Sequence, residues 1–422
     1  MPDHKLSHLA ETLIGSEIVK LGAEIKEKIR QGNRIFNYTI GDFDSSIFPI
    51  PVELQDEIIT AYREGHTSYP PADGIAELRK MVAEFLLGRE GLDYSPQEIL
   101  IGAGGRPLIY AAYRTLIDRD DKVIYPVPSW NNNHYVHFTE GRHVLIHTRE
   151  ENKFMPTAEE IAPHLAGARL LALCSPLNPT GTTFSKDNLE AICRIVLEEN
   201  KRRGPEEKKL FVLFDQIYWT LTFGDTVHYN PVSLNPEMKE YTIFIDGISK
   251  SFAATGVRVG WSMGPEKIIQ KMKALNSHVG AWSPMAEQFA TARYLSKKER
   301  IDQYLSQFKS EIEERLQLIY EGLNQLRQEG FPVKAIAPQA AIYLTVSIDL
   351  AGKKTSSGQP ITDQPAVTAY LLEKAGLAIV PFSAFGAPEN SCWYRLSVGT
   401  CRKEEIPEML GKLREALRGV SQ

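Results

Sequence analysis

The stretch DGISKSFAATGVRVG, residues 246–260, follows an apolar run at residues 241–245 and interrupts it with small residues. A β-branched and aromatic run of this kind is typical of a buried parallel strand, and the glycines and serines that follow predict a turn. The turn carries Lys250, and Arg258 lies eight residues later, before a second apolar stretch. A lysine beside such a turn is usually a solvated surface lysine, so its meaning depends on polar residues elsewhere in the chain.

The composition is typical of a two-domain globular protein. The 422 residues are 43% hydrophobic and 24% charged, which predicts a large folded core. The net charge of −5 gives no reason to expect nucleic acid or an acidic membrane as a partner. No apolar run approaches the ~20 residues of a membrane span, and the N-terminal segment lacks the continuous apolar core of a signal peptide.

The cysteines indicate a reducing compartment. Cys174, Cys193, Cys392 and Cys401 have neither metal-ligand spacing nor a C-x-x-C pair, so we expect no metal site. Two of them lie in apolar stretches, where a buried, reduced thiol is expected. Reduced cysteines favour a cytoplasmic location.

Strand-like and helix-like segments alternate through the middle of the chain. Apolar runs predict strands at residues 99–102, 122–125, 143–147, 170–174 and 210–214. Amphipathic segments predict helices at residues 51–64, 75–87, 108–117, 130–138, 157–165 and 185–201. This alternation is typical of an α/β domain with a mainly parallel sheet, whose strands end at one edge, where such sheets bind ligands.

The two ends of the chain predict a second, smaller α+β domain. Apolar residues spaced by three and four predict a helix over residues 10–31, and residues 36–41 are strand-like. A long helix over residues 297–329 is expected to lead out of the large domain. Beyond it we predict strands at 342–348, 377–380 and 394–398, helices at 366–374 and 404–417, and a mobile surface loop at 352–365. We therefore predict a large domain over 47–299 and a discontinuous small domain over 1–46 and 300–422.

Two charged residues stand where a strand would have to bury them. Asp215 directly follows five apolar residues, and a carboxylate there is costly to bury unless it meets a cation; a helix cap or turn residue is the alternative. Arg395 lies in an alternating, half-buried strand pattern. If the Arg395 side chain points inward, it needs an anion, and its planar guanidinium can pair with both oxygens of a carboxylate. The alternative is a surface arginine that pairs with a glutamate.

Two loops contain candidate ligand contacts. Gly104, Gly105 and Arg106 precede a predicted helix, and small residues there let backbone N–H groups approach a phosphate at a helix N-terminus. The alternative is an ordinary tight turn between strand and helix. Asn178 opens the tetrapeptide Asn-Pro-Thr-Gly, which by itself is common turn chemistry.

In chain order, Asn178, Asp215, Tyr218, Lys250 and Arg258 resemble the motif set of pyridoxal-phosphate aminotransferases of the aspartate aminotransferase-like class, that is class I/II, fold type I. That family has Ser-Lys, a small and aromatic stretch, Gly-x-Arg, then an apolar residue and Gly, as residues 249–260 do here. The resemblance extends over essentially the whole chain. It implies bound pyridoxal 5'-phosphate and ping-pong transfer of an amino group between an L-amino acid and a 2-oxo acid.

The resemblance also implies a role for each site residue. Lys250 would hold the cofactor covalently and move the substrate proton as general acid and base. Asp215 would pair with the protonated pyridine nitrogen, and Tyr218 and Asn178 would hold the ring's phenolic oxygen. Arg395 would anchor the substrate α-carboxylate, with Gly41 and Asn178 beside it. The further cofactor contacts that it implies are Gly104, Gly105, Arg106, Trp130, Ser249 and Arg258.

Some positions depart from the family pattern or reach beyond one chain. Gly247 stands where a serine or threonine often contacts the phosphate, and Ser249 is expected to supply that hydroxyl. Arg106 stands where lysine or threonine is common. Tyr69 matches a tyrosine that reaches the phosphate of the neighbouring subunit, which implies a homodimer with shared active sites.

The sequence leaves the reaction and the donor partly open. A C–S lyase performing β-elimination on the same fold is the main alternative, and a non-catalytic cofactor-binding sensor is a weaker one. No second arginine is assigned to a substrate side chain, which argues against strict aspartate specificity. Phe43, Ile217 and Trp282 favour an apolar donor side chain. A role in amino-acid biosynthesis is expected from the family resemblance.

Overall fold

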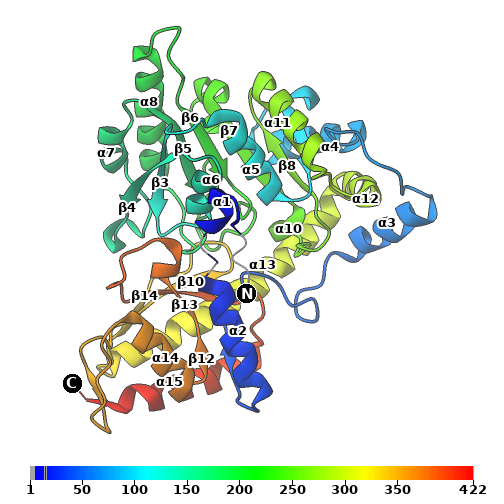
Figure 1. Ribbon diagram of the computed structural model, residues 1–422. Coiled ribbons are helices and arrows are strands. Elements are labelled where there is room, and N and C mark those ends of the chain that lie inside the picture. Colours follow the sequence, from blue (N-terminus) through cyan, green and yellow to red (C-terminus); the bar gives the residue numbers. More distant parts are fainter. Residues whose placement is uncertain (1–4, 14, 16, 422) are drawn as a thin grey trace.

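Figure 1 shows the computed structural model of the chain, which describes residues 5–13, 15 and 17–421. A large sheet with flanking helices forms one part of the molecule, and a smaller sheet with its own helices forms the other. The long helix α13 (Lys298–Gln328) leads from the first part to the second, as the sequence predicts. Among the described residues, no helix has the length and apolarity needed to cross a membrane.

The large sheet has seven strands in the order β2-β8-β7-β6-β5-β3-β4. Their bounds are β2 Ile99–Gly102, β3 Lys122–Val127, β4 Arg142–His147, β5 Ala168–Cys174, β6 Phe211–Asp215, β7 Thr242–Gly247 and β8 Gly260–Met263. The neighbours from β7 to β4 pair in parallel, while β8 is antiparallel to both β2 and β7. The prediction of a mainly parallel sheet is therefore confirmed.

Successive residues of the central strands pack on opposite faces of this sheet. In β6, Val212 and Phe214 belong to one buried cluster, whereas Phe211 and Leu213 belong to another. Both faces are therefore covered, which explains why these strands are continuous apolar runs rather than alternating patterns.

Most helices of the large domain occur where the sequence predicts them. They are α3 Val52–Arg63, α4 Ala76–Glu90, α5 Gly105–Leu116, α6 Asn132–Phe138, α7 Ala158–Ile161 and α8 Lys186–Arg202. The structure adds two long helices that the sequence analysis does not propose, α11 Glu266–Val279 and α12 Met285–Leu295. Helix α11 packs against α5, and α12 packs against α3 and α4.

The small domain is built on an antiparallel sheet in the order β13-β14-β10-β9. Its strands are β9 Val333–Ala335, β10 Tyr343–Ile348, β13 Val380–Pro381 and β14 Trp393–Ser397, and its helices are α14 Gln364–Lys374 and α15 Ile406–Arg418. The predicted loop at 352–365 is not wholly irregular, because β11 (Lys354–Thr355) pairs with β15 (Val420–Ser421) and α14 begins at Gln364.

The N-terminal segment packs on this small domain. Strand β1 (Phe36–Asn37) pairs in parallel with β12 (Leu377–Ala378), and Ile25 of helix α2 (Glu17–Arg30) is buried among residues of the same region. Ile14 of the predicted first helix lies outside the described residues. These contacts support the predicted discontinuous domain, whose exact boundaries remain a prediction.

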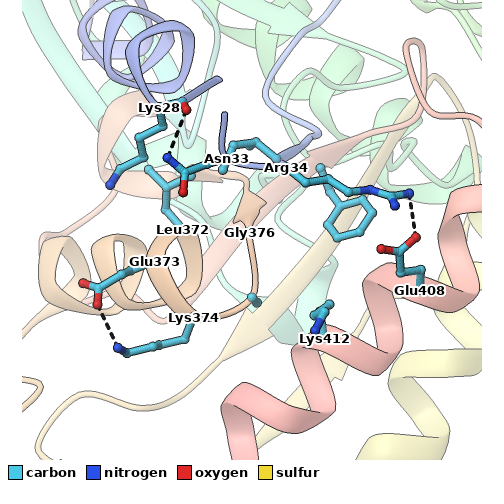
Figure 2. A pocket seen from close by; sticks show the side chains of 12 residues that line it. Lys28, Asn33, Arg34, Leu372, Glu373, Lys374, Gly376, Glu408 and Lys412 are labelled. Carbon is cyan, nitrogen blue, oxygen red and sulfur yellow. Dashed lines mark hydrogen bonds and ion pairs between the residues drawn. The ribbon is translucent and has the colours of Figure 1, made fainter. Parts of the chain in front are cut away.

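A cavity of about 250 Å³ lies where the N-terminal segment meets α14 and α15, and Figure 2 shows the side chains that line it. Its rim is held by polar contacts: Arg34 pairs with Glu408 at 2.5 Å, and the Asn33 side chain donates to the Lys28 carbonyl at 3.0 Å. The charged groups around this cavity are thus largely engaged with one another.

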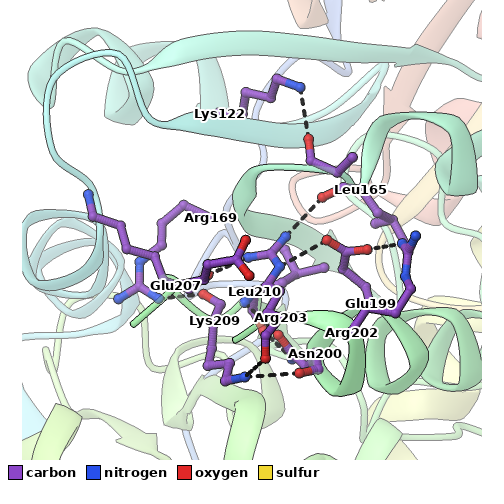
Figure 3. A network of polar contacts seen from close by, with 12 residues as sticks. Lys122, Leu165, Arg169, Glu199, Asn200, Arg202, Arg203, Glu207, Lys209 and Leu210 are labelled. Atoms are coloured by element: carbon purple, nitrogen blue, oxygen red, sulfur yellow. Dashed lines mark hydrogen bonds and ion pairs between the residues drawn. The ribbon is translucent and has the colours of Figure 1, made fainter. Parts of the chain in front are cut away.

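A polar network fixes the amino-terminal ends of β5 and β6, opposite the edge where these strands end (Figure 3). Arg203 and Glu199 pair at 2.9 Å, and each side chain is only 5% exposed. The Arg203 guanidinium also donates to the Leu165 carbonyl, and Asn200 exchanges two hydrogen bonds with the backbone of Leu210. A buried ion pair needs such additional partners, because it otherwise does not recover its desolvation cost.

Candidate active site

Lys250, Asp215 and Asn178 come from three neighbouring parallel strands. Asp215 is the last residue of β6, and it is in register with Cys174 of β5 and Ile245 of β7. Asn178 lies four residues beyond β5, and Lys250 lies three residues beyond β7. Because parallel strands end at the same edge of a sheet, the acid and the amine meet at one edge.

Lys250 lies on the short helix α10 (Ile248–Ser251) and points toward the N-terminal segment. Its Nζ donates to the Gly41 carbonyl at 2.6 Å and lies 5.5 Å from the Phe43 ring centroid and 5.7 Å from that of Tyr218. Burial lowers the pKa of Lys250 to about 8. Asp42 opposes this change in pKa, whereas the positive charges of nearby arginines add to it, namely Arg395, Arg106 and Arg258.

Asp215 is a carboxylate without a counter-ion in the described part of the chain. Its Oδ1 accepts a hydrogen bond from the backbone N–H of Ile217 at 3.0 Å. Burial raises the pKa of Asp215 to about 6, and that single backbone donor only partly offsets the increase. A carboxylate held this way fits a positively charged ligand nitrogen, which would supply the missing cation.

Arg395 is a buried positive charge without an acidic partner among the described residues. It lies on β14, is 2% exposed, and forms no ion pair with any described acidic side chain. One guanidinium nitrogen donates to Asn178 Oδ1 at 3.0 Å and the other to the Thr39 carbonyl at 2.7 Å, while Nε has no described partner. A buried guanidinium with only neutral partners fits a ligand carboxylate.

Tyr218 and Gly41 lie close to this arginine through one shared neighbour, Tyr343 of β10. The hydroxyls of Tyr218 and Tyr343 are 2.6 Å apart, and the Arg395 guanidinium carbon lies 4.7 Å from the Tyr343 ring centroid. A Cβ at Gly41 would lie 2.8 Å from the Tyr343 hydroxyl and 3.5 Å from an Arg395 nitrogen. Only glycine leaves this space open.

The glycine-rich turn before α5 meets Arg258. Gly104 is the N-cap of α5 and has φ +87°, and a Cβ there would lie 2.3 Å from an Arg258 nitrogen. Arg258 donates to the Ala103 and Thr255 carbonyls at 2.7 and 2.6 Å. Ser249 is buried just before Lys250. A helix N-terminus beside an arginine is a suitable place for a phosphate.

Two guanidinium groups lie near the ring of Trp130. The guanidinium carbons of Arg106 and Arg395 are 5.4 and 5.9 Å from its ring centroid. Tyr69, by contrast, is 83% exposed, and its ring makes an edge contact with Trp282 at 5.3 Å. A phosphate contact for Tyr69 therefore stays a prediction that requires a second subunit.

The sequence analysis missed Tyr343 and Asp42. Tyr343 had no distinguishing signal, because all six residues of β10 are buried and no alternation singles it out. Asp42 directly follows Gly41, and its carboxylate accepts a hydrogen bond from the Thr255 hydroxyl at 2.6 Å. The predicted site residues line neither the cavity of Figure 2 nor a larger one of about 970 Å³ beside α8.

The chemistry of these groups fits pyridoxal phosphate. They include an amine for the aldehyde, a carboxylate without a cation partner among the described residues for the ring nitrogen, a tyrosine hydroxyl for the phenolic oxygen, and a glycine turn with an arginine for the phosphate. In the described residues no cluster of three or more histidine, cysteine or acidic side chains could hold a metal ion.

Comparison with known proteins identifies the family. The family model for aminotransferases of class I and II matches residues 35–413. Aspartate aminotransferase of Geobacillus stearothermophilus is 32% identical, over 94% of this chain and 95% of that protein. The probable aspartate/prephenate aminotransferase of Aquifex aeolicus is 27% identical, over 99% of this chain and 98% of its own.

Solved structures confirm the predicted fold. Aspartate aminotransferase from Rhizobium meliloti has a TM-score of 0.90 at 28% identity, covering 99% of this chain and 100% of its own. The Thermus thermophilus aspartate aminotransferase with maleate has a TM-score of 0.85 at 28% identity, covering 98% and 100%. The chain therefore belongs to the class I and II aminotransferases, and it is a transaminase that depends on pyridoxal phosphate.

Proposed function

We propose that Lys250 is the catalytic residue of this transaminase. It would bind the cofactor covalently, and, once displaced by the incoming amino acid, it would take the proton from the substrate Cα and return it to the cofactor side. The bound cofactor supplies the electron sink that makes this proton acidic. The observation that carries the proposal is the position of the half-buried Lys250 amine at the same edge of the sheet as Asp215 and Asn178, where burial lowers its pKa to about 8.

Arg395 is proposed to hold the substrate α-carboxylate in two parallel hydrogen bonds. Its burial and its lack of an acidic partner among the described residues support this role. Asn178, which accepts from Arg395, and Gly41, which leaves space beside it, would complete the carboxylate site. Binding there would set the substrate Cα near Lys250, whose Nζ already contacts Gly41.

The remaining predicted residues are proposed to hold the cofactor. Asp215 would keep the ring nitrogen protonated, and Tyr218 and Asn178 would contact the phenolic oxygen. Trp130 would stack on the ring and exclude water from it. The proposed phosphate contacts are Gly104, Gly105, Arg106, Ser249 and Arg258.

We propose L-aspartate as the first donor, because relatives at 27–32% identity are named aspartate or aspartate/prephenate aminotransferases. The arginines around Lys250 favour anionic substrates as well. An apolar donor is the alternative, and the Phe43 ring 5.5 Å from Lys250 Nζ favours it. Initial rates with a panel of amino acids, and 2-oxoglutarate or pyruvate as acceptor, separate the two: a donor such as leucine that exceeds aspartate in kcat/KM contradicts the first choice.

The assembly and location are also proposals. Tyr69 is exposed and makes an edge contact with the half-buried Trp282, and a second subunit would cover it, which supports a homodimer with shared sites. Four free cysteines support a cytoplasmic location. The proposed role in amino-acid biosynthesis follows from the aminotransferase family. Sedimentation of the loaded protein tests the dimer, and a monomer with full activity would contradict it.

The catalytic proposal is tested with Lys250→Ala and, as a control, Lys271→Ala, which changes an exposed lysine of α11. The Lys250 variant should lose the visible absorbance of lysine-bound cofactor and at least about 10³-fold in rate, while the control keeps both. Wild-type turnover by Lys250→Ala would overturn the proposal. Release of pyruvate and ammonia from a cysteine conjugate, without an oxo-acid acceptor, would indicate the lyase instead.

A further inference from the structure

Tyr343 joins the two halves of the site without belonging to the residues that the family motifs identify. Its hydroxyl lies 2.6 Å from the Tyr218 hydroxyl, and both side chains are almost fully buried. Tyr343 comes from β10 of the small domain, whereas Tyr218 follows β6 of the large domain. The contact therefore spans 125 residues of sequence and connects the two domains at the reaction centre.

The two tyrosine hydroxyls can each donate only one hydrogen bond, which limits how they can be paired. Each tyrosine hydroxyl carries one proton and can also accept. When Tyr218 donates its proton to the phenolic oxygen of the cofactor, it has none left for Tyr343, so the short contact requires Tyr343 to donate to the Tyr218 oxygen. A hydroxyl that accepts in this way becomes a stronger donor, because hydrogen bonds in a chain polarise one another.

We propose that Tyr343 is a positioning residue, which donates to the Tyr218 hydroxyl and thereby aims and strengthens the bond from Tyr218 to the cofactor's phenolic oxygen. The inference rests on the proposed cofactor contacts of Tyr218. The ring of Tyr343 has a separate function: the Arg395 guanidinium lies over it at 4.7 Å. A phenylalanine at this position keeps that ring and removes only the hydroxyl.

The two roles predict different kinetic effects. In the loaded enzyme, the nitrogen that links Lys250 to the cofactor would hold a proton that the phenolic oxygen attracts. A strong hydrogen bond from Tyr218 to the phenolic oxygen weakens this attraction. Loss of the Tyr343 hydroxyl should weaken that hydrogen bond, so the linking nitrogen should keep its proton up to a higher pH. Substrate binding through Arg395 should change little, because the ring beneath the guanidinium remains.

The test is Tyr343→Phe in the loaded enzyme, measured by titrating the visible absorbance with pH. The expected result is an upward shift of the midpoint by roughly 0.5–1 pH unit, with kcat reduced about 3- to 10-fold and KM for the donor changed less than about twofold. Tyr294→Phe is the matched control, since Tyr294 is buried and its hydroxyl has no described hydrogen-bond partner. That control should shift neither quantity.

A second variant separates action through Tyr218 from a general structural effect. In a Tyr218→Phe background, Tyr343→Phe should cause no further shift, because the group through which it acts is gone. An equal shift in both backgrounds, or no shift in the wild-type background, overturns the inference. If the wild-type protein itself shows no lysine-bound absorbance, the proposed function fails instead, so the two failures are distinguishable.

Discussion

The Arg395 guanidinium donates a hydrogen bond to Asn178 Oδ1 over 3.0 Å, and this bond connects β14 of the small domain to the loop after β5 of the large domain. The proposed substrate anchor and a proposed cofactor contact therefore position each other. Since Asn178 is neutral, it leaves the arginine's charge available for an incoming carboxylate.

Arg395→Lys should impair substrate binding more than cofactor binding. A lysine is a point charge that cannot form the bidentate pair, so kcat/KM for amino acids should fall about 10- to 100-fold. The cofactor absorbance should remain. An amine without an α-carboxylate is the internal control, because its slow reaction should differ little between variant and wild type. A similar loss for both substrates would place Arg395 outside carboxylate recognition.

Gly104→Ala should weaken the binding of the cofactor. The new Cβ would lie 2.3 Å from an Arg258 nitrogen, and φ +87° is a conformation that alanine adopts with strain. Displacement of Arg258 from the turn should raise the dissociation constant of pyridoxal phosphate at least about tenfold, equivalent to about 1.4 kcal/mol. Titration of the cofactor-free protein measures this constant.

Gly256→Ala is the matched control for that experiment. Gly256 precedes Arg258 by two residues, and a Cβ there meets no atom within 4 Å. Its substitution should change the dissociation constant less than about twofold. Equal losses in both variants would show that the segment responds to any added methyl group rather than to the contact between Gly104 and Arg258.

Capture of the cofactor by Lys250 should depend on pH with a midpoint near 8. Only the neutral amine can attack an aldehyde, and burial lowers the pKa of Lys250 to about 8, so the rate of capture should fall about tenfold per unit below that pH. Stopped-flow mixing of cofactor-free protein with pyridoxal phosphate between pH 6 and 9 measures it. Asp42→Asn should move the midpoint lower, because Asp42 raises the pKa of Lys250. An unchanged midpoint would indicate that Asp42 does not act on the amine.

The sequence predicts the edge of the large sheet well, because short apolar runs ending in Asp215 and before Lys250 report local structure directly. It predicts α12 poorly, since this helix buries residues around its circumference, including Ala286, Gln288 and Thr291, and so lacks one apolar stripe. The Tyr218–Tyr343 contact could not be predicted from local patterns at all. It depends on how the two domains meet, which neither strand encodes by itself.

Asp215→Asn should stabilise the cofactor-free protein at high pH and have no such effect at low pH. The carboxylate has a pKa of about 6 in the folded protein and 3.8 as its ordinary value, so the folded state binds this proton more tightly than the unfolded state does. The energetic penalty of the charged form is therefore absent below pH 3.8, grows as pH rises, and is complete above about pH 6. Because Asp215 is partly accessible, we expect a gain of about 1–3 kcal/mol at pH 8.

Thermal unfolding of cofactor-free wild type and variant at pH 4 and pH 8 measures this difference. The loaded proteins should show the reverse order at pH 8, since the asparagine cannot pair with a protonated ring nitrogen and so gains less from the cofactor. If variant and wild type differ equally at both pH values, folding does not change the pKa of the Asp215 carboxyl. In that case burial would impose no penalty on the charged form of Asp215, and its assignment to the cofactor nitrogen would lose its physical basis.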